Sequence, residues 1–339
     1  MLKKALIQTL HAFSSFIPLG LLQSISQQRL LSLFYHTISD DDLPHIKHLY
    51  RVRDSKTFRQ DLDYLLQHYE PIDLSQLIEH VHKGRTLPKN AFFLTFDDGL
   101  SECYHVIAPI LKEKGIPATF FLNSDFVDNK ALMFRYKASY LIDLLLTDKA
   151  ADSLLHEHFS QYQLPYKNVY SLLKVRWLQQ TMLDDIAQAI GLDFKTYLQA
   201  KQPYLSQQQV QSMHEDGFTF GSHSQNHPMY QSIPLEQQVD QTLLSQQYIQ
   251  EQFQIPYKVF AFPFTDTGVS KAFFKQILEE EKFQLTFGGA GIKHETISGQ
   301  LQRFGIETQE NTSIKSLIHS EYCYYLIKAL FRKNTIHRQ

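Results

Sequence analysis

Two groups of side chains with acid–base and metal-binding chemistry follow apolar runs of this chain. One apolar run, 91–96, ends in the paired carboxylates of Asp97 and Asp98. Far downstream, His223 and His227 lie four positions apart after a second apolar run. One carboxylate and two imidazoles make a three-ligand site that suits a divalent transition metal and leaves positions open for water and substrate. The second carboxylate is then free to act as a general base.

The two neighbouring carboxylates are expected to have different roles, one in metal binding and one in proton transfer. We assign Asp98, with the two histidines, to the metal, and Asp97 to taking a proton from water whose pKa the metal lowers. Successive residues of a strand point to opposite sides, so the chain must turn here for both carboxylates to face one pocket. Gly99 permits that turn.

Each motif taken alone has a simpler explanation. Asp-Asp-Gly is typical of a solvated turn, and pairs of histidines are common on surfaces. The combination, with each motif placed directly after an apolar strand, favours a metal site. His36 follows the first predicted strand, and it either lines the same pocket or is a structural histidine.

Charge and cysteine content exclude several classes of protein. The 339 residues include 33 Lys and Arg against 35 Asp and Glu, so the chain has no basic field for nucleic acid. Two cysteines give neither a disulfide framework nor a zinc-ribbon spacing. The 25 Phe and 18 Tyr predict a large aromatic core, with some rings available to stack on sugars.

The two ends are amphipathic rather than membrane-spanning. Residues 1–30 are predicted to form a helical segment, because polar residues interrupt the apolar run and no cleavage site follows. Residues 311–339 are predicted to form a helix with a basic tail. Neither end reaches the ~18 apolar residues of a membrane span. The ends pack on the domain or contact an anionic inner leaflet, which predicts a cytoplasmic or peripheral inner-membrane location and leaves export open.

Strand and helix patterns alternate over 31–310, which predicts an α/β fold. The strands are expected at 31–36, 91–96, 116–122, 217–221, 258–262, 283–287 and 303–306. Polar residues cluster just after these strands, as at the carboxyl rim of a parallel barrel, so the pattern favours a barrel over an open doubly wound sheet. Residues 129–204 have helical periodicity and few strand signals, and we interpret them as a helical insertion that walls one side of the site.

Several motifs resemble those of the polysaccharide deacetylase family, the NodB-homology group of carbohydrate esterase family 4. Residues 95–98 (Thr-Phe-Asp-Asp) match the first family motif, and 223–228 (His-Ser-Gln-Asn-His-Pro) match the second. Residues 115–122 (Gly-Ile-Pro-Ala-Thr-Phe-Phe-Leu) are also similar to the family. The resemblance covers roughly 31–306, and the helical insertion is the part that matches poorly.

The resemblance implies a distorted (β/α) barrel of about seven strands. It implies that Asp97 is the general base and that Asp98, His223 and His227 hold the metal, with Zn²⁺ expected and Co²⁺, Ni²⁺ or Mn²⁺ as alternatives. The implied reaction is hydrolysis of an N-acetyl group on an amino sugar, with release of acetate. The implied partner is an N-acetylated carbohydrate of a bacterial envelope or exopolysaccharide pathway.

The chain departs from the family in its third motif. Where the family often has Arg-x-Pro-Tyr, residues 261–264 read Ala-Phe-Pro-Phe. Pro263 is expected to line the pocket, and the backbone N–H of Phe264 to help bind the oxyanion. The missing arginine leaves the orientation of the base open, with Arg303 or Arg135 as substitutes.

The family's late general-acid histidine has no clear counterpart. His294 is the nearest candidate, and it is either the acid or a bystander in a glycine-containing loop. Two other functions stay open. The chain is a related C–N hydrolase, such as a deformylase or deacetylase of a lipid-linked or nucleotide sugar, or it is a catalytically silent carbohydrate-binding relative.

Overall fold

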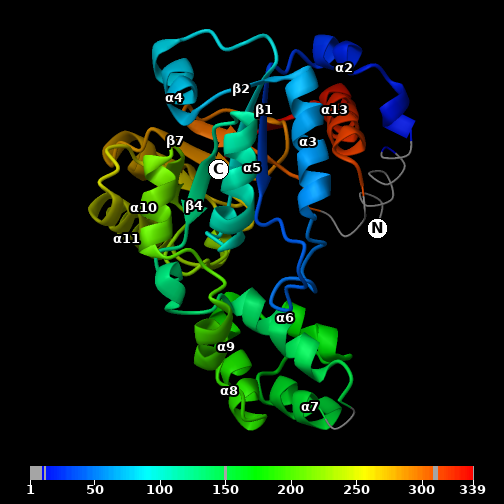
Figure 1. The fold of residues 1–339 in the computed structure, drawn as a ribbon, viewed down its shortest axis with the longest axis vertical. Coiled ribbons are helices and arrows are strands. Elements are labelled where there is room, and N and C mark those ends of the chain that lie inside the picture. Colours follow the sequence, from blue (N-terminus) through cyan, green and yellow to red (C-terminus); the bar gives the residue numbers. More distant parts are fainter. Residues whose placement is uncertain (1–9, 11–12, 149–150, 308–311, 339) are drawn as a thin grey trace.

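Eight parallel strands form a nearly closed barrel with helices around it (Figure 1). The computed structural model describes residues 10, 13–148, 151–307 and 312–338. Along the sheet the strands run β10 (Phe304–Gly305), β1 (Leu30–Tyr35), β3 (Ala91–Phe96), β4 (Thr119–Leu122), β5 (Thr219–Ser222), β6 (Val259–Ala261), β7 (Leu285–Gly288) and β9 (Gln300–Gln302). The predicted (β/α) barrel is therefore confirmed.

The ring has eight strands rather than about seven because the last segment contributes two. β9 and β10 are separated only by Arg303, yet they occupy the two ends of the strand order. The barrel comes close to closing at this residue. A two-residue strand, β2 (Glu70–Pro71), also pairs with β3, and β8 (His294–Glu295) pairs with β11 (Thr335–Ile336) apart from the barrel.

The strands are apolar on both faces because each face meets a separate core. On β3, Phe92 and Phe96 pack outward against the helices, whereas Phe93 belongs to an inner core with Phe121 and Phe287. β3 and β7 are not neighbours in the sheet, so the rings of Phe93 and Phe287, stacked with centroids 5.6 Å apart, meet across the barrel interior. Continuous apolar runs are typical of such doubly covered strands.

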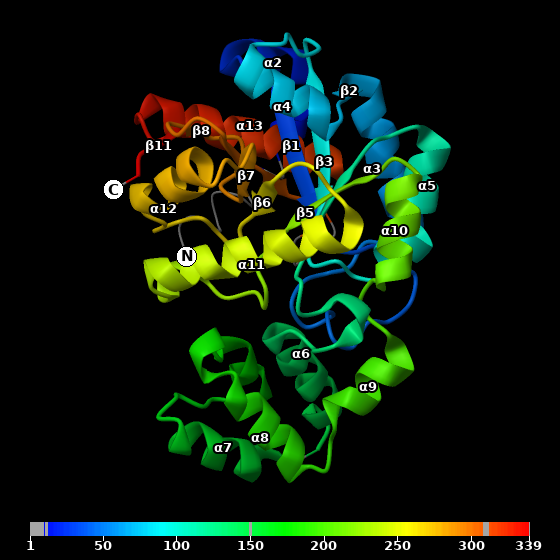
Figure 2. The ribbon, with the colours of Figure 1, turned by 90° about the vertical axis from the view of Figure 1, so that its left-hand side faces the viewer.

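Helices surround the barrel (Figure 2), and some of them begin at a residue whose side chain caps the first turn. Asp54 caps α3, and Asp73 forms a capping box with Gln76 at α4, which satisfies N–H groups that a helix start leaves unpaired. The surrounding α-helices are α2 (Leu19–Ser26), α3 (Ser55–His68), α4 (Leu74–Lys83), α5 (Ala108–Lys114), α10 (Gln207–Glu215), α11 (Leu235–Phe253), α12 (Lys271–Phe274) and α13 (Ile314–Leu330). Short helical turns are η1 (Ser14–Phe16), η2 (Cys103–Ile107), η3 (Val127–Asn129), η6 (Tyr230–Ser232) and η7 (Lys275–Glu280).

A group of helices between β4 and β5 extends from one end of the barrel (Figures 1 and 2). It contains α6 (Phe134–Leu145), α7 (Ala151–Gln161), η4 (Val169–Lys174), η5 (Trp177–Gln179), α8 (Thr181–Ala189) and α9 (Phe194–Lys201). These elements share a hydrophobic core of their own, which includes Leu141, Leu155 and Ile186. The stretch interpreted as a helical insertion thus packs around its own centre and presents α6 to the barrel.

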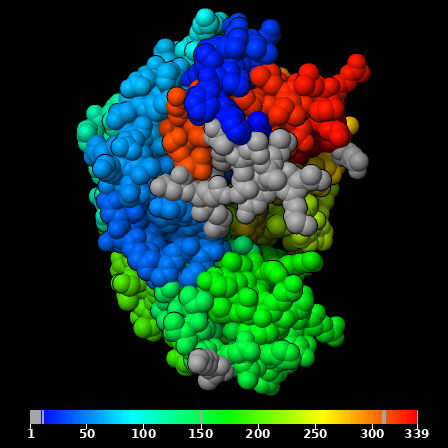
Figure 3. Space-filling view, turned by 90° about the vertical axis from the view of Figure 1, so that its right-hand side faces the viewer, coloured from blue at the N-terminus to red at the C-terminus, as the bar shows by residue number. Residues whose placement is uncertain are grey.

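The first and last helices of the described ranges lie on the same side of the barrel. α13 packs against η1 and α2, and in Figure 3 the N-terminal and C-terminal segments are side by side above the helical group. Residues 1–9, 11 and 12 of the predicted N-terminal helical segment, and 311 and 339 of the predicted C-terminal one, are outside the described residues. No helix in the described ranges is long and apolar enough to cross a bilayer. Membrane contact stays a prediction.

Candidate active site

A cavity of about 280 Å³ opens at the carboxyl ends of the barrel strands. Asp97 and Asp98 reach it from the end of β3, and His223 and His227 from the turn after β5. The structure therefore brings together all four residues that the sequence analysis selected. Residues of α6 complete the wall, so the helical group borders the cavity as the sequence predicted.

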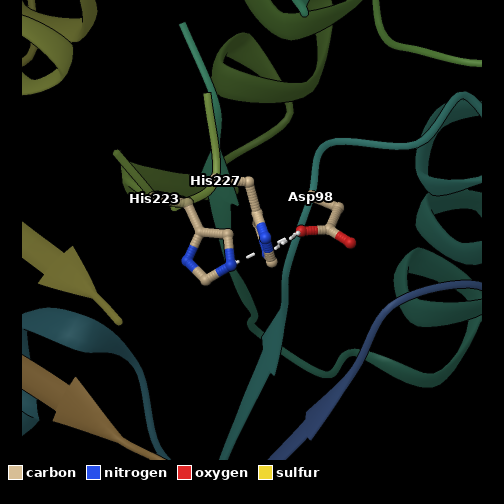
Figure 4. Close-up of side chains that lie close together, drawn as sticks. All are labelled: Asp98, His223 and His227. Carbon is tan, nitrogen blue, oxygen red and sulfur yellow. Dashed lines mark ion pairs between the residues drawn. The ribbon is translucent and has the colours of Figure 1, made fainter. Parts of the chain in front are cut away.

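Asp98, His223 and His227 converge on one point (Figure 4). The Nε2 atoms of His223 and His227 lie 3.4 and 3.1 Å from Asp98 Oδ1. All three residues are buried, and Asp98 Oδ1 has no hydrogen-bond donor among the described residues. A buried carboxylate oxygen without a donor is costly, and a cation held by the three groups would remove that cost.

The hydrogen bond of His223 sets its tautomer for metal binding. Its Nδ1 lies 2.8 Å from the carbonyl oxygen of Ala261, so Nδ1 donates its proton and the Nε2 lone pair faces Asp98. Burial lowers the pKa of His227 below its ordinary value, which keeps that ring neutral as well. Two neutral imidazoles and one carboxylate are a donor set that fits Zn²⁺ and related metals.

The turn that aims both carboxylates into the cavity begins at Asp98 itself. Asp98 has a left-handed backbone with φ 70°, and Gly99 follows with φ 65°. The sequence analysis expected the turn at the two carboxylates and named Gly99 as the residue that permits it. Aspartate is one of the few residues with a side chain that adopts this conformation readily. At Gly99 a β-carbon would lie 2.8 Å from Leu122 Cδ2, so glycine is required there for space as well as for backbone freedom.

Tyr136, on the first turns of α6, supports the carboxylate of Asp98. Its hydroxyl donates to Asp98 Oδ2 across 2.6 Å, and both side chains are buried. Oδ2 is thereby occupied and Oδ1 is left for a metal. This contact makes the helical group part of the site, and no motif in the sequence indicated it.

Arg303 holds the proposed base, Asp97, through two parallel hydrogen bonds. Its Nη1 lies 2.7 Å from Oδ1 and its Nη2 lies 2.8 Å from Oδ2. Burial alone would raise the pKa of Asp97, but the guanidinium of Arg303, with the charged His36 nearby, holds the pKa below its ordinary value. Asp97 is therefore ionised and fixed in orientation, which a bidentate arginine pair achieves better than a lysine would.

Arg303 reaches Asp97 from inside the barrel, although the third motif has no arginine. Its guanidinium lies inside the barrel over the rings of Phe34 and Phe121, 4.8 and 5.2 Å from their centres. Ala261 belongs to the inner core that contains Phe121, one of the rings beneath this guanidinium. The sequence offered two arginines as partners for Asp97. Arg303 is the one that contacts Asp97, whereas Arg135 donates to the carbonyl oxygen of Leu173.

His36 lines the cavity and is held by Glu307. Its Nδ1 lies 2.8 Å from Glu307 Oε2, and its backbone N–H donates to Glu307 Oε1 across 2.5 Å. Burial lowers the pKa of His36, but the carboxylate of Glu307 outweighs burial and raises it to about 9. His36 is therefore a charged donor at neutral pH, and its Nε2 is the nitrogen not engaged by Glu307.

The remaining predicted residues differ in their distance from the cavity. Phe264 lines it with its ring centre 4.4 Å from that of His227. Within the described part of the chain the Phe264 N–H donates to no acceptor, and its φ is 57°. Pro263 lies between two lining residues but does not line the cavity itself. His294 lies on β8, outside the cavity, where its ring nitrogen meets Gln28 Nε2 at 3.1 Å. The structure does not bring His294 to the site.

Comparison with known proteins agrees with this geometry. The family model described as polysaccharide deacetylase matches residues 84–277, which is more than half of the chain. The chain therefore belongs to the polysaccharide deacetylase family, and the resemblance drawn from the motifs is confirmed. Family membership confirms the expected enzyme class, a hydrolase acting on non-peptide C–N bonds.

Curated relatives match a short part of the chain. A poly-β-1,6-N-acetyl-D-glucosamine N-deacetylase of Escherichia coli K12 is 28% identical over 125 residues, which are 35% of this chain and 18% of that protein. The same enzyme of E. coli O157:H7 is 29% identical over 102 residues, 30% of this chain and 15% of that protein. The chain thus spans less than a fifth of the length of these relatives.

Solved structures share the fold over most of the chain. IcaB from Ammonifex degensii has a TM-score of 0.55 and 16% identity, covering 87% of this chain and 97% of its own. The Streptococcus pyogenes deacetylase PplD has a TM-score of 0.54 and 16% identity, covering 86% and 97%. A de-N-acetylase from Aggregatibacter actinomycetemcomitans has a TM-score of 0.53 and 19% identity, covering 85% and 99%. At these identities the likeness concerns the barrel fold.

Proposed function

We propose that this protein removes N-acetyl groups from an amino sugar in a glycan or glycoconjugate, and that it needs a divalent metal to do so. The observation that carries the proposal is the convergence of Asp98, His223 and His227 beside an ionised, arginine-held Asp97. Amino-sugar polymers are the substrates named for the curated relatives. The arginine that the third motif lacks is supplied by Arg303, which weakens the alternative of a silent binding relative.

The metal ligands would be Asp98 Oδ1 and the Nε2 atoms of His223 and His227. Bound there, a divalent metal supplies a Lewis acid for the acyl carbonyl and acidifies the attacking water. The chain prepares this site before binding: Tyr136 occupies the other oxygen of Asp98, and the carbonyl of Ala261 fixes the ring of His223. We propose Zn²⁺ as the metal because the donor set combines two imidazoles with one carboxylate.

Asp97 takes the proton of the attacking water. Its carboxylate is ionised, and both of its oxygens accept from Arg303, so it meets the water in one orientation. As the water oxygen bonds to the acyl carbon, negative charge develops on the carbonyl oxygen. We assign the contact with that charge to the backbone N–H of Phe264, a residue that lines the cavity with its ring against His227.

His36 gives the proton that the departing nitrogen needs. When the C–N bond breaks, the amine nitrogen must gain a proton, and the charged His36 is a donor that lines the same cavity. Glu307 keeps that proton on the ring at neutral pH and fixes the ring through Nδ1. The products are acetate and the free amino sugar. Glu307 acts as a positioning residue, because it reaches the reaction only through His36.

Replacing His223 with alanine tests the metal and the reaction together. We expect the variant to lose its bound metal, measured by elemental analysis of the purified protein, and its acetate release from an N-acetylated amino-sugar oligomer. His105→Ala, at an exposed histidine outside the cavity, is the matched control and is expected to keep both. Full acetate release from the metal-free His223→Ala protein would refute the proposed function.

A further inference from the structure

A second cavity of about 740 Å³ adjoins the catalytic one. It lies between the helical group and the turn after His227, where η4 and η5 face η6. Arg135 and Phe264 line both cavities, so the two meet at these residues. We call the second cavity the basic groove, and its lining includes Arg135, Lys174, Arg176, Trp177, Met229 and Phe264. A substituent on a sugar bound at the catalytic cavity would pass Phe264 into this groove.

The basic groove carries three cations and no acid. Arg135, Lys174 and Arg176 line it, and no aspartate or glutamate does. None of the three cations forms an ion pair with any described residue, although the whole chain has a formal charge of −2. Arg135 donates to the carbonyl oxygen of Leu173, and its other guanidinium donors have no acceptor in the described part of the chain. The positive charge is thus local and unneutralised.

This charge discriminates between candidate substrates. A polymer of amino sugars gains an ammonium group at each deacetylated unit, and the three cations, which have no acidic partner, would repel that group. A neutral sugar would leave the cations without partners. Three cations are matched by a ligand with two or more negative charges, which a single carboxylate does not supply. Arginine and lysine together are a common phosphate-binding combination.

We propose that the basic groove binds a phosphoryl or pyrophosphoryl group attached to the N-acetylated sugar. The proposal rests on the proposed function, because it places the sugar in the catalytic cavity. Arg135 lies at the junction and contacts the phosphoryl group nearest the sugar, while Lys174 and Arg176 pair with the outer charges. Trp177 and Met229 give the groove an apolar wall for the carrier beyond the phosphates. A nucleotide and a lipid are both carriers of this chemistry.

The test compares four substrates in acetate-release assays on the metal-loaded protein. They are a neutral N-acetylglucosamine oligomer, N-acetylglucosamine 1-phosphate, uridine diphosphate N-acetylglucosamine, and N-acetylglucosamine linked through pyrophosphate to a short prenyl chain. We expect kcat/KM for the best phosphorylated substrate to exceed that of the neutral oligomer by about tenfold or more. The advantage should shrink as ionic strength rises, because salt screens exposed cations. Comparison of the uridine diphosphate sugar with the prenyl pyrophosphate sugar then shows whether the natural carrier is a nucleotide or a lipid.

The double variant Lys174→Gln/Arg176→Gln removes two groove cations that are exposed and outside the catalytic cavity. We expect its kcat/KM to fall by about tenfold for phosphorylated substrates and to stay within about twofold for the neutral oligomer. Lys167→Gln/Lys201→Gln removes two exposed charges from the same helical group outside the groove, and it should change neither. Equal activity on neutral and phosphorylated substrates, or equal losses on both in the groove variant, overturns the proposal.

A binding measurement keeps this test separate from the proposed function. Titration calorimetry with inorganic pyrophosphate on the whole protein should show binding that weakens by about tenfold in the groove variant and not in its control. If pyrophosphate binds both variants and the parent equally, the groove is not a phosphoryl site, even if acetate is released. If pyrophosphate binds as expected and no substrate releases acetate, the proposed function fails while the phosphoryl site stands.

Discussion

At the scale of single residues, Arg303 supplies the guanidinium that holds Asp97, which the family resemblance led us to expect in the third motif. Arg303 comes from the last barrel segment instead of the end of β6, and it meets Asp97 with its two terminal nitrogens, Nη1 and Nη2. Sequence reasoning identified Asp97 because motifs are local. It could only name Arg303 as one of two candidates, because the pair spans 206 positions and exists only once the barrel has formed.

Replacing Arg303 with lysine should lower kcat by about 10²-fold while metal content stays unchanged. Lysine keeps the charge but not the two-pronged geometry, so Asp97 would no longer be held in one orientation. Stopped-time acetate assays with metal analysis on the same samples measure both quantities. A kcat within twofold of the parent would show that orientation by Arg303 does not matter.

At the scale of elements, the helical group contributes a helix to the active site. α6 brings Tyr136 to Asp98 and Arg135 to the junction with the basic groove. The periodicity of 129–204 predicted helices, and its polar faces gave no sign of a catalytic contact. Glu307 was missed for a related reason, since a single glutamate after a short strand has no recognisable spacing to His36, 271 positions away.

The contact from α6 leads to a prediction for metal affinity. Tyr136→Phe removes the hydroxyl that donates to Asp98 Oδ2, and loss of such a supporting bond commonly weakens metal binding by about 10–100-fold. Competition with a chromophoric chelator measures the affinity for Zn²⁺. Tyr140→Phe, one turn further along α6 and outside the cavity, is the control and should bind Zn²⁺ as the parent does. If the affinity for Zn²⁺ is unchanged in Tyr136→Phe, the contact from α6 does not support metal binding.

At the scale of the whole molecule, the barrel and the helical group are joined by buried polar contacts. His45, in the loop after β1, lies 2.7 Å from the Tyr197 hydroxyl of α9 and packs edge-on against Tyr136. Burial lowers the pKa of His45 to about 4. The barrel itself was predictable from alternating strands and helices. This junction was not, because it depends on one histidine in a loop without a recognisable motif.

The junction should make stability depend on pH. In the unfolded chain His45 is protonated below the ordinary histidine pKa of about 6.5. In the folded protein the same ring stays neutral until the pH falls to about 4. Stability from this group is therefore complete above pH 6.5 and is lost as pH falls toward 4, by up to about 3 kcal/mol. Urea unfolding across that range should show a weaker loss in His45→Asn than in the parent. Parallel curves for the two proteins would contradict the assignment.

The place of Arg303 at the seam of the barrel has a consequence for biosynthesis. A nascent chain that has emerged as far as β7 carries Asp98, His223 and His227, so its metal ligands are all present. It still lacks the counter-ion of Asp97, which arrives between the last two strands. The segment that completes the barrel therefore also brings the arginine that orients Asp97, the proposed base. Truncated products of translation contain ligands for a metal without an oriented base.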